Sequence, residues 1–189
     1  MNIVKVCKVE RIRGKSLVLR NARVSDASFV LTLRMDENKA RHISKISGEL
    51  LLQENWLLDY AKRDSEAYFI IENLQGMPLG TIRIYDAKGD SFCWGSWILK
   101  SEAPQNAAIE SALIAYSYAL KFLGFSNAHF QVNKSNQRVC KFHERFGATR
   151  VFEDEIQYEY TIANNAILLA MEKYRRYLPD GIVLEDITK

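Results

Sequence analysis

Paired cysteines, long apolar runs and a large net charge are all absent from this sequence of 189 residues. Its three cysteines, Cys7, Cys93 and Cys140, lie far apart and form neither a CxxC pair nor a zinc-like cluster with histidine. No stretch approaches the roughly 20 apolar residues of a membrane span, and the first residues lack the apolar region and cleavage site of a signal peptide. We therefore expect free thiols in a reducing cytoplasm, with no metal and no membrane contact.

Few breaks interrupt the chain, because it contains only nine glycines and three prolines. With 48% hydrophobic and 26% charged residues, it has the composition of one folded domain. The formal net charge of +3 is too small to indicate a nucleic-acid partner. A basic run from Lys5 to Lys15 alternates with apolar residues, which favours a strand with one solvated face over a phosphate-binding arm.

Hydrophobic periodicity predicts alternating groups of strands and helices. Strands are expected at 18–21, 68–72, 79–85, 91–99, 128–132, 148–153 and 156–162, and helices at 27–35, 49–63, 107–123, 137–146 and 166–177. Gly124 and Gly147 each follow a helical pattern directly, as terminating glycines do. Three consecutive strands, a strand–helix–strand crossover and a closing hairpin predict an α/β (α+β) fold, with a mixed, mainly antiparallel sheet and helices on both faces.

Two strand–loop–helix segments carry features beyond folding. The first, WILKSEAPQNAAIESAL at 97–113, runs from a strand through small residues into the start of a long helix. Unpaired amides and the positive end of the helix dipole make such a start suited to an anion such as pyrophosphate. Taken alone, the segment also fits an ordinary structural connection, since every strand–loop–helix unit has such amides.

The second segment, VNKSNQRVCKFHERFGA at 132–148, carries a more specific pattern. It resembles the last core helix of the GNAT superfamily of acyl-CoA N-acyltransferases, N-x-x-(A/V)-x-x-(L/F)-Y-x-(K/R)-(L/F)-G-(F/A). The matching positions are Asn136, Val139, Phe142, His143, Arg145, Phe146, Gly147 and Ala148. By strand and helix order the resemblance covers 17–162, with 1–16 as an N-terminal extension and 163–189 as a C-terminal helix and tail.

This resemblance implies that acetyl-CoA lies in a V-shaped gap between the strands ending at Leu99 and Val132. Its pantetheine amides would pair with a strand edge, its pyrophosphate would bind amides at the helix start, and a backbone N–H near Leu99 would stabilise the oxyanion. The cofactor-binding residues implied are Ile98, Leu99, Lys100, Gln105, Asn106, Ala107, Ala108, Ile109, Glu110, Asn133, Asn136, Val139, Phe142, His143 and Arg145.

Two positions depart from the family pattern. The usual phosphate loop is (Q/R)-x-x-G-x-(G/A), whereas no glycine follows Gln105, and Ala108 or Ala107 takes the small position depending on register. A carboxylate near a pyrophosphate is unfavourable, so we expect Glu110 to point away. His143 stands where the family has a tyrosine assigned to the departing thiolate. A histidine with an ordinary pKa near ~6.5 is a competent acid, although a packed polar residue at a helix end fits the same sequence.

Charged and aromatic residues gather on segments that border the acceptor cleft in similar enzymes. Candidate substrate-binding residues are Arg34, His42, Arg83, Tyr85, Trp94 and Ser96, and Asp86 is the first candidate for a general base, ahead of His42 and His129. An arginine beside aromatic residues suits an acceptor with negative charge and a stacking surface. The stretch 33–99 looks like a branch that acetylates amino sugars on nucleotide carriers.

The predicted activity is transfer of acetyl from acetyl-CoA to a primary amine, with a nucleotide-linked amino sugar as the first expectation. Acetylation of a protein or peptide N-terminus and a non-catalytic CoA-binding module are the alternatives, and a homodimer is left open. For Arg83, the structural alternative is an ion pair with Asp86 or Asp90.

Overall fold

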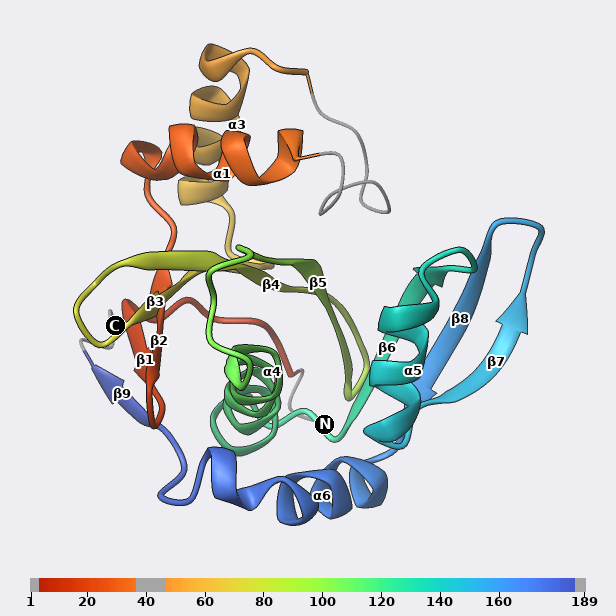
Figure 1. Cartoon of the computed structure of the whole chain (residues 1–189). Helices are drawn as coiled ribbons and strands as arrows, with labels where there is room; N and C mark the ends of the chain where they lie inside the picture. The colour runs from red at the N-terminus through yellow and green to blue at the C-terminus, as the bar shows by residue number, and fades with distance from the viewer. Residues whose placement is uncertain (1–3, 37–46, 186–189) are drawn as a thin grey trace.

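The computed structural model describes residues 4–36 and 47–185 (Figure 1). The strands in these ranges form one sheet in the order β7-β8-β6-β5-β4-β3-β2-β1-β9. They are β1 (Arg11–Arg13), β2 (Leu17–Asn21), β3 (Ala67–Asn73), β4 (Pro78–Lys88), β5 (Ser91–Leu99), β6 (Asn127–Asn133), β7 (Thr149–Glu153), β8 (Gln157–Ile162) and β9 (Val183–Glu185). The α-helices are α1 (Ala27–Met35), α3 (Leu50–Lys62), α4 (Ala107–Tyr118), α5 (Gln137–Arg145) and α6 (Asn164–Lys173). Short 3-10 turns precede α1 and follow α6, and a π-helical turn (Ala119–Leu123) extends α4.

Helices cover both faces of the sheet, with α1 and α3 over one face and α4 and α6 under the other (Figure 1). The inner strand β3 is buried on both sides because its apolar run is continuous. Phe69 and Ile71 pack into the main core with α4, while Tyr68 and Ile70 pack into the cluster formed with α1 and α3. Every strand pair is antiparallel except β5–β6, so the predicted fold class is confirmed.

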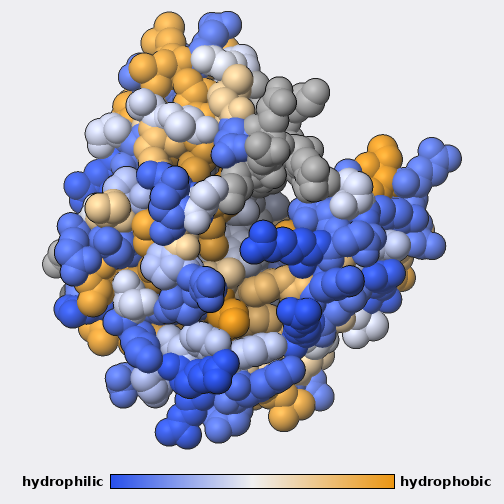
Figure 2. Space-filling model, in the orientation of Figure 1, coloured by the Kyte–Doolittle hydropathy of each residue, from blue (hydrophilic) through white to orange (hydrophobic). Residues whose placement is uncertain are grey.

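The parallel strands β5 and β6 pair only at their first residues, Ser91↔Asn127 and Phe92↔Ala128. Beyond these residues the two strands diverge, as the resemblance predicts (Figure 1). Within the described part of the chain, the edge of β5 that faces β6 therefore has no strand partner from residue 93 onward. Figure 2, in the same orientation, shows a hollow beside this divergence, with apolar surface on its floor and hydrophilic surface around it.

Irregular backbone marks β4 and β5 next to this divergence. Their register shifts between Thr81 and Arg83 and again after Tyr85. Two residues other than glycine have a positive φ here, Asp86 at 51° and Ser96 at 47°. Such conformations are costly and are retained mainly where the surrounding structure imposes them, often at functional sites.

Both segments predicted to flank the domain contribute to its core. Val6 and Ile12 are buried before β2, and Ile167 and Leu178 are buried after β8. In addition, β9 pairs with β1, so Ile12 lies opposite Leu184. The cysteines are free thiols, as expected. Within residues 4–36 and 47–185, no helix is both long and apolar enough to cross a membrane, and no three His, Cys, Asp or Glu side chains cluster to hold a metal.

Candidate active site

The start of α4 offers free amides beside the diverging strands. The N–H of Ala107 donates to the carbonyl of Pro104 at 2.9 Å, and the N–H of Glu110 donates to the carbonyl of Asn106 at 2.9 Å. The other amides expected to hold a pyrophosphate, those of Gln105, Asn106, Ala108 and Ile109, have no backbone acceptor in the described ranges. Because α4 continues for three turns behind them, these amides lie at the positive end of a helix dipole.

Glu110 is turned toward the connection between β1 and β2, as its predicted orientation requires. Its fully buried carboxylate accepts the backbone N–H of Ser16 at 2.6 Å and that of Leu17 at 2.9 Å. It also accepts the Ser16 hydroxyl, and the Asn106 side-chain amide at 3.3 Å. Because its backbone N–H is already bonded to Asn106 and its side chain is buried, Glu110 is not available to bind the cofactor, which corrects its predicted role.

The other edge of β5, away from β6, is paired with β4. Ile98 and Leu99 pair with Thr81 and Gly80, and the N–H of Lys100 donates to the carbonyl of Leu79 at 2.8 Å. The amide of Lys100 is therefore not free for a pantetheine amide, which corrects its predicted role.

Most of the expected residues on α5 form its cap or its packing. The Asn136 side chain accepts the N–H of Val139 at 3.4 Å and so caps the helix, while the Asn133 side chain accepts the N–H of Ser135 in the preceding turn at 2.9 Å. Phe142 packs against Trp97 with ring centroids 4.9 Å apart, and Arg145 is exposed. Gly147, at φ 91°, ends the helix as predicted.

His143 fills the space between β5 and β6. Its ring lies 4.0 Å from the Phe130 ring and 5.1 Å from the Trp94 ring, and only 5% of its surface is exposed. This burial lowers the pKa of His143 to about 3, and its Nδ1 has no hydrogen-bond partner among residues 4–36 and 47–185. The imidazole is therefore neutral near pH 7, and the expected pKa near ~6.5 is wrong.

Trp94 does not lie on the predicted acceptor face. It stands opposite Ile84 of β4, whose side chain is in the main core, and it packs edge-on against Tyr116 of α4. It is 3% exposed. The register shift and the positive φ of Ser96 break the simple alternation on which the prediction relied. Trp94 thus belongs to the wall behind His143 rather than to the acceptor face.

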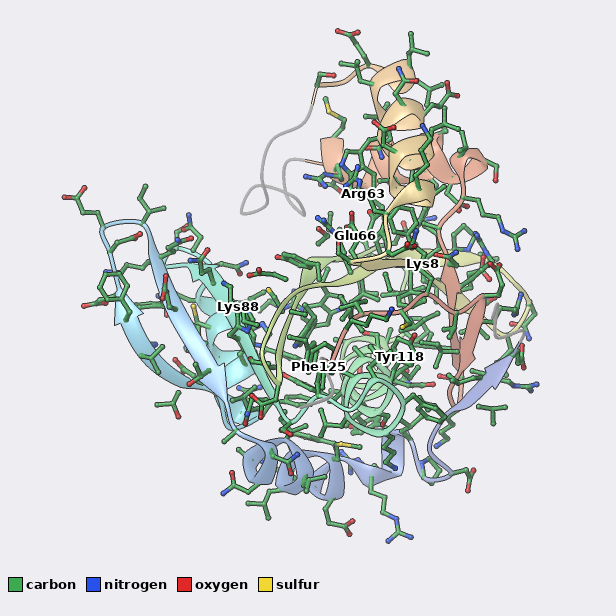
Figure 3. All side chains as sticks on the ribbon, turned by 180° about the vertical axis from the view of Figure 1, so that it is seen from behind. Lys8, Arg63, Glu66, Lys88, Tyr118 and Phe125 are labelled. Carbon is green, nitrogen blue, oxygen red and sulfur yellow. The ribbon has the colours of Figure 1, made fainter. Side chains whose placement is uncertain are left out.

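Arg83 and Tyr85 share the opposite face, as predicted, with the guanidinium 4.5 Å from the tyrosine ring. The acidic partner of Arg83 is Glu66, which is buried and also binds Arg63 at 2.7 Å. Arg63 and Glu66 lie together where α3 leads into β3 (Figure 3). The alternative ion pairs of Arg83 with Asp86 or Asp90 are therefore wrong.

Two other expected acceptor residues have different outcomes. Arg34, in the last turn of α1, is half-buried, and its pKa is lowered first by burial and then by the charge of Arg83, which places the two guanidinium groups near one another. His42 lies outside the described residues.

Asp86 and His129, proposed separately as bases, meet where β5 and β6 begin to part. His129 Nε2 lies 3.2 Å from Asp86 Oδ2, and Lys88 Nζ lies 2.8 Å from the same oxygen. Hydrogen bonds from Lys88 and then from His129 lower the pKa of the Asp86 carboxyl. Lys88 stands on the hairpin beside β6 (Figure 3).

A pocket of about 380 Å³ collects several of these side chains. It is lined by Lys5, Val6, Ser65, Glu66, Arg83, Tyr85, Asp86 and Ala87. Sequence reasoning missed Glu66, which carries no motif, and considered Lys5 only as part of a basic run with one solvated face.

A family model described as an acetyltransferase (GNAT) domain matches residues 16–149, which is most of the chain. The chain belongs to the GNAT acetyltransferases. GNAT enzymes use acetyl-CoA as the acyl donor, so this protein is an acyl-CoA-dependent acetyltransferase, as predicted.

Among solved structures, the GNAT chain is similar to apo FdhC, described as a nucleotide-linked sugar GNAT, with 36% identity and a TM-score of 0.80 over 89% of this chain and 98% of that one. A GCN5-related N-acetyltransferase from Brucella melitensis shares the fold at 14% identity and a TM-score of 0.75, covering 90% and 86% of the two chains. Spermidine N-acetyltransferase from Vibrio cholerae, in complex with CoA and spermine, shares it at 16% identity and a TM-score of 0.68, covering 81% and 98%. No curated protein matches the sequence.

Proposed function

We propose that this protein transfers the acetyl group of acetyl-CoA to the amine of a nucleotide-linked sugar. The observation that carries the proposal is the pocket in which Arg83, Tyr85 and Asp86 follow one another along β4. The 36% identity to a nucleotide-linked sugar GNAT, over 89% of this chain, supports the same class of acceptor.

The side chains of the pocket suit an acceptor that carries both an amine and a phosphate. Arg83 binds Glu66 through Nε alone, so its terminal N–H groups can bind an anion. Asp86 lies three residues further along the strand, at a spacing of roughly 10 Å. A sugar ring between amine and phosphate spans a gap of this order. The pocket's charged residues, Lys5, Glu66, Arg83 and Asp86, balance in sign, which does not favour a polycation such as a polyamine.

The donor side fits acetyl-CoA. The free amides of Gln105, Asn106, Ala108 and Ile109 would hold its pyrophosphate, and the unpaired edge of β5 would pair with its pantetheine amides. Bound acetyl-CoA supplies an activated thioester carbonyl.

His143 is neutral and enclosed by aromatic rings. Its role in this proposal is that of an N–H donor in the gap between β5 and β6, and it does not release a proton near pH 7. The proton lost by the acceptor amine passes to Asp86, whose carboxylate faces the pocket.

The test is release of the CoA thiol with a panel of nucleotide-linked amino sugars, peptides and polyamines. Arg83→Ala should raise the KM for the sugar acceptor roughly tenfold to a hundredfold, since a charge-assisted contact to an anion contributes about 1.5–3 kcal/mol. The KM for acetyl-CoA should change little.

Arg63→Ala is the matched control for this test. It removes the other guanidinium bound to Glu66 but lies outside the pocket lining. Turnover confined to peptides or polyamines, or an equal rise in KM for both variants, would contradict the proposal.

A further inference from the structure

Ser91, His129 and Asp86 form a chain of hydrogen bonds across three strands. Ser91 Oγ lies 2.8 Å from His129 Nδ1, and His129 Nε2 lies 3.2 Å from Asp86 Oδ2. Phe92 and Ala128, which neighbour this chain, are buried in the main core. Because side chains alternate along a strand, Ser91 and His129 point to the other face, which carries Arg83.

The positions of the protons in this hydrogen-bonded series follow from the ionised carboxylate of Asp86. An ionised carboxylate only accepts hydrogen bonds, so Nε2 of His129 carries the proton that it shares with Asp86. In the neutral ring, Nδ1 then carries a lone pair, and Ser91 donates its hydroxyl proton to it. Lys88 donates to the same carboxylate oxygen, Oδ2. No donor from the described part of the chain reaches the other oxygen, Oδ1.

The backbone holds this carboxylate in an uncommon conformation. Asp86 has a φ of 51°, which costs energy for a residue other than glycine and needs the surrounding contacts to maintain it. His129 is the first residue of β6 beyond its pairing with β5, and Asp86 lines the pocket of about 380 Å³. The free oxygen thus belongs to a carboxylate that borders both the acceptor pocket and the point where the strands part.

We propose that His129 and Ser91 are positioning residues, which fix Asp86 so that its free Oδ1 receives the proton of the acceptor amine. The inference rests on the proposed function. As the amine nitrogen forms the new C–N bond, the C–S bond of the thioester breaks and its electron pair leaves on sulfur. The proton lost from nitrogen passes to Oδ1. His129 keeps its own proton throughout and holds Oδ2 in place.

The kinetic test compares His129→Leu with His129→Gln. The leucine variant should lose at least roughly tenfold in kcat, toward the lower range of acid–base effects, with an unchanged KM for acetyl-CoA. Glutamine offers an N–H at a similar reach and should restore kcat to within about threefold of the parent, because hydrogen-bond donation is what the role requires. Gln131→Leu is the matched control, since Gln131 lies two residues further along β6 and binds Glu159 instead.

Two results would overturn the inference in these assays. Full kcat in His129→Leu would remove His129 from the reaction, and equal losses in the leucine and glutamine variants would show that the ring only packs. If the parent acetylates a different amine, the proposed acceptor fails, and the same variants measured with that amine decide the positioning role separately.

A spectroscopic test is independent of the acceptor. Nitrogen-15 NMR of the parent should show the His129 ring as the Nε2–H tautomer, and Ser91→Ala should shift it toward a mixture because the donor to Nδ1 is lost. An Nδ1–H tautomer in the parent would overturn the inference even in the absence of turnover.

Discussion

Replacing Glu110 with alanine should destabilise the protein strongly, because its side chain ties the start of α4 to the connection between β1 and β2. Its carboxylate is fully buried and accepts backbone N–H groups from Ser16 and Leu17. Alanine would leave the buried N–H of Leu17 and the partly buried N–H of Ser16 without an acceptor. The connection between β1 and β2 would then lose its attachment to the start of α4.

The magnitude follows from the donors left unpaired. A buried donor without a partner costs about 1–3 kcal/mol. The buried Leu17 N–H, the partly buried Ser16 N–H and the Ser16 hydroxyl, which loses its acceptor as well, together give roughly 4 kcal/mol. That is a large share of the ~5–15 kcal/mol by which folded domains are stable. Both backbone N–H groups bond to the same oxygen, Oε1, so Glu110→Gln can keep these two bonds while its amide group faces the Ser16 hydroxyl, which can also accept. The glutamine variant should therefore lose much less stability than the alanine variant.

Urea unfolding measures the effect directly. With an m-value of about 2 kcal/mol/M, the alanine variant should unfold at a midpoint lower by about 2 M at unchanged m. Amide exchange at Ser16 and Leu17 should accelerate more than in β3. Glu102→Ala is the control, because Glu102 is exposed on the loop before α4 and should change stability by less than about 0.5 kcal/mol. A loss below 1 kcal/mol in Glu110→Ala would refute the role of the buried acceptor.

Two further predictions concern the gap between β5 and β6. Burial lowers the pKa of His143 to about 3 from its ordinary 6.5. Between these two values, His143 binds a proton in the unfolded chain but stays neutral in the folded one. The free energy of unfolding should therefore decrease as the pH is lowered from 6.5, by up to about 1.4 kcal/mol per pH unit. His143→Leu should remove roughly 2 kcal/mol of the loss between pH 6.5 and 5.0. The same pH dependence of the unfolding free energy in parent and variant, measured with urea, would count against the burial argument. Ala108→Trp, in the first turn of α4, should weaken acetyl-CoA binding in calorimetry and leave the unfolding midpoint unchanged. Glu102→Trp, on the exposed loop before α4, should keep the affinity. An unchanged affinity in Ala108→Trp would place the pyrophosphate elsewhere.

Local sequence was sufficient for the regular elements. The predicted ranges 27–35 and 91–99 coincide with α1 and β5, because both have clear periodicity and clear ends. The short strand β9 could not be found in this way. Its three residues carry no pattern of their own, and they are extended because Leu184 pairs with Ile12 from the other end of the chain.

The candidate site shows the same division between local and distant information. The motif on α5 located His143, but its pKa depends on Phe130 and Trp94, which come from two different strands. The acidic partner of Arg83 is Glu66, which precedes β3, whereas sequence reasoning considered only nearby acids. The face of Trp94 was predicted wrongly because a register shift and the positive φ of Ser96 interrupt the alternation of side chains.

The pairing of β1 with β9 has a consequence for synthesis of the chain on the ribosome. Arg11 and Glu185 face each other across this pair, so the outer edge of β1 has no strand beside it until residue 185 has been translated. At about 5–20 residues per second, that interval lasts on the order of ten seconds or more. During this time, a nascent chain presents an open strand edge to its neighbours on a polysome. Slow translation between β1 and β9 should therefore increase aggregation of this protein, because it prolongs the time for which this edge is open.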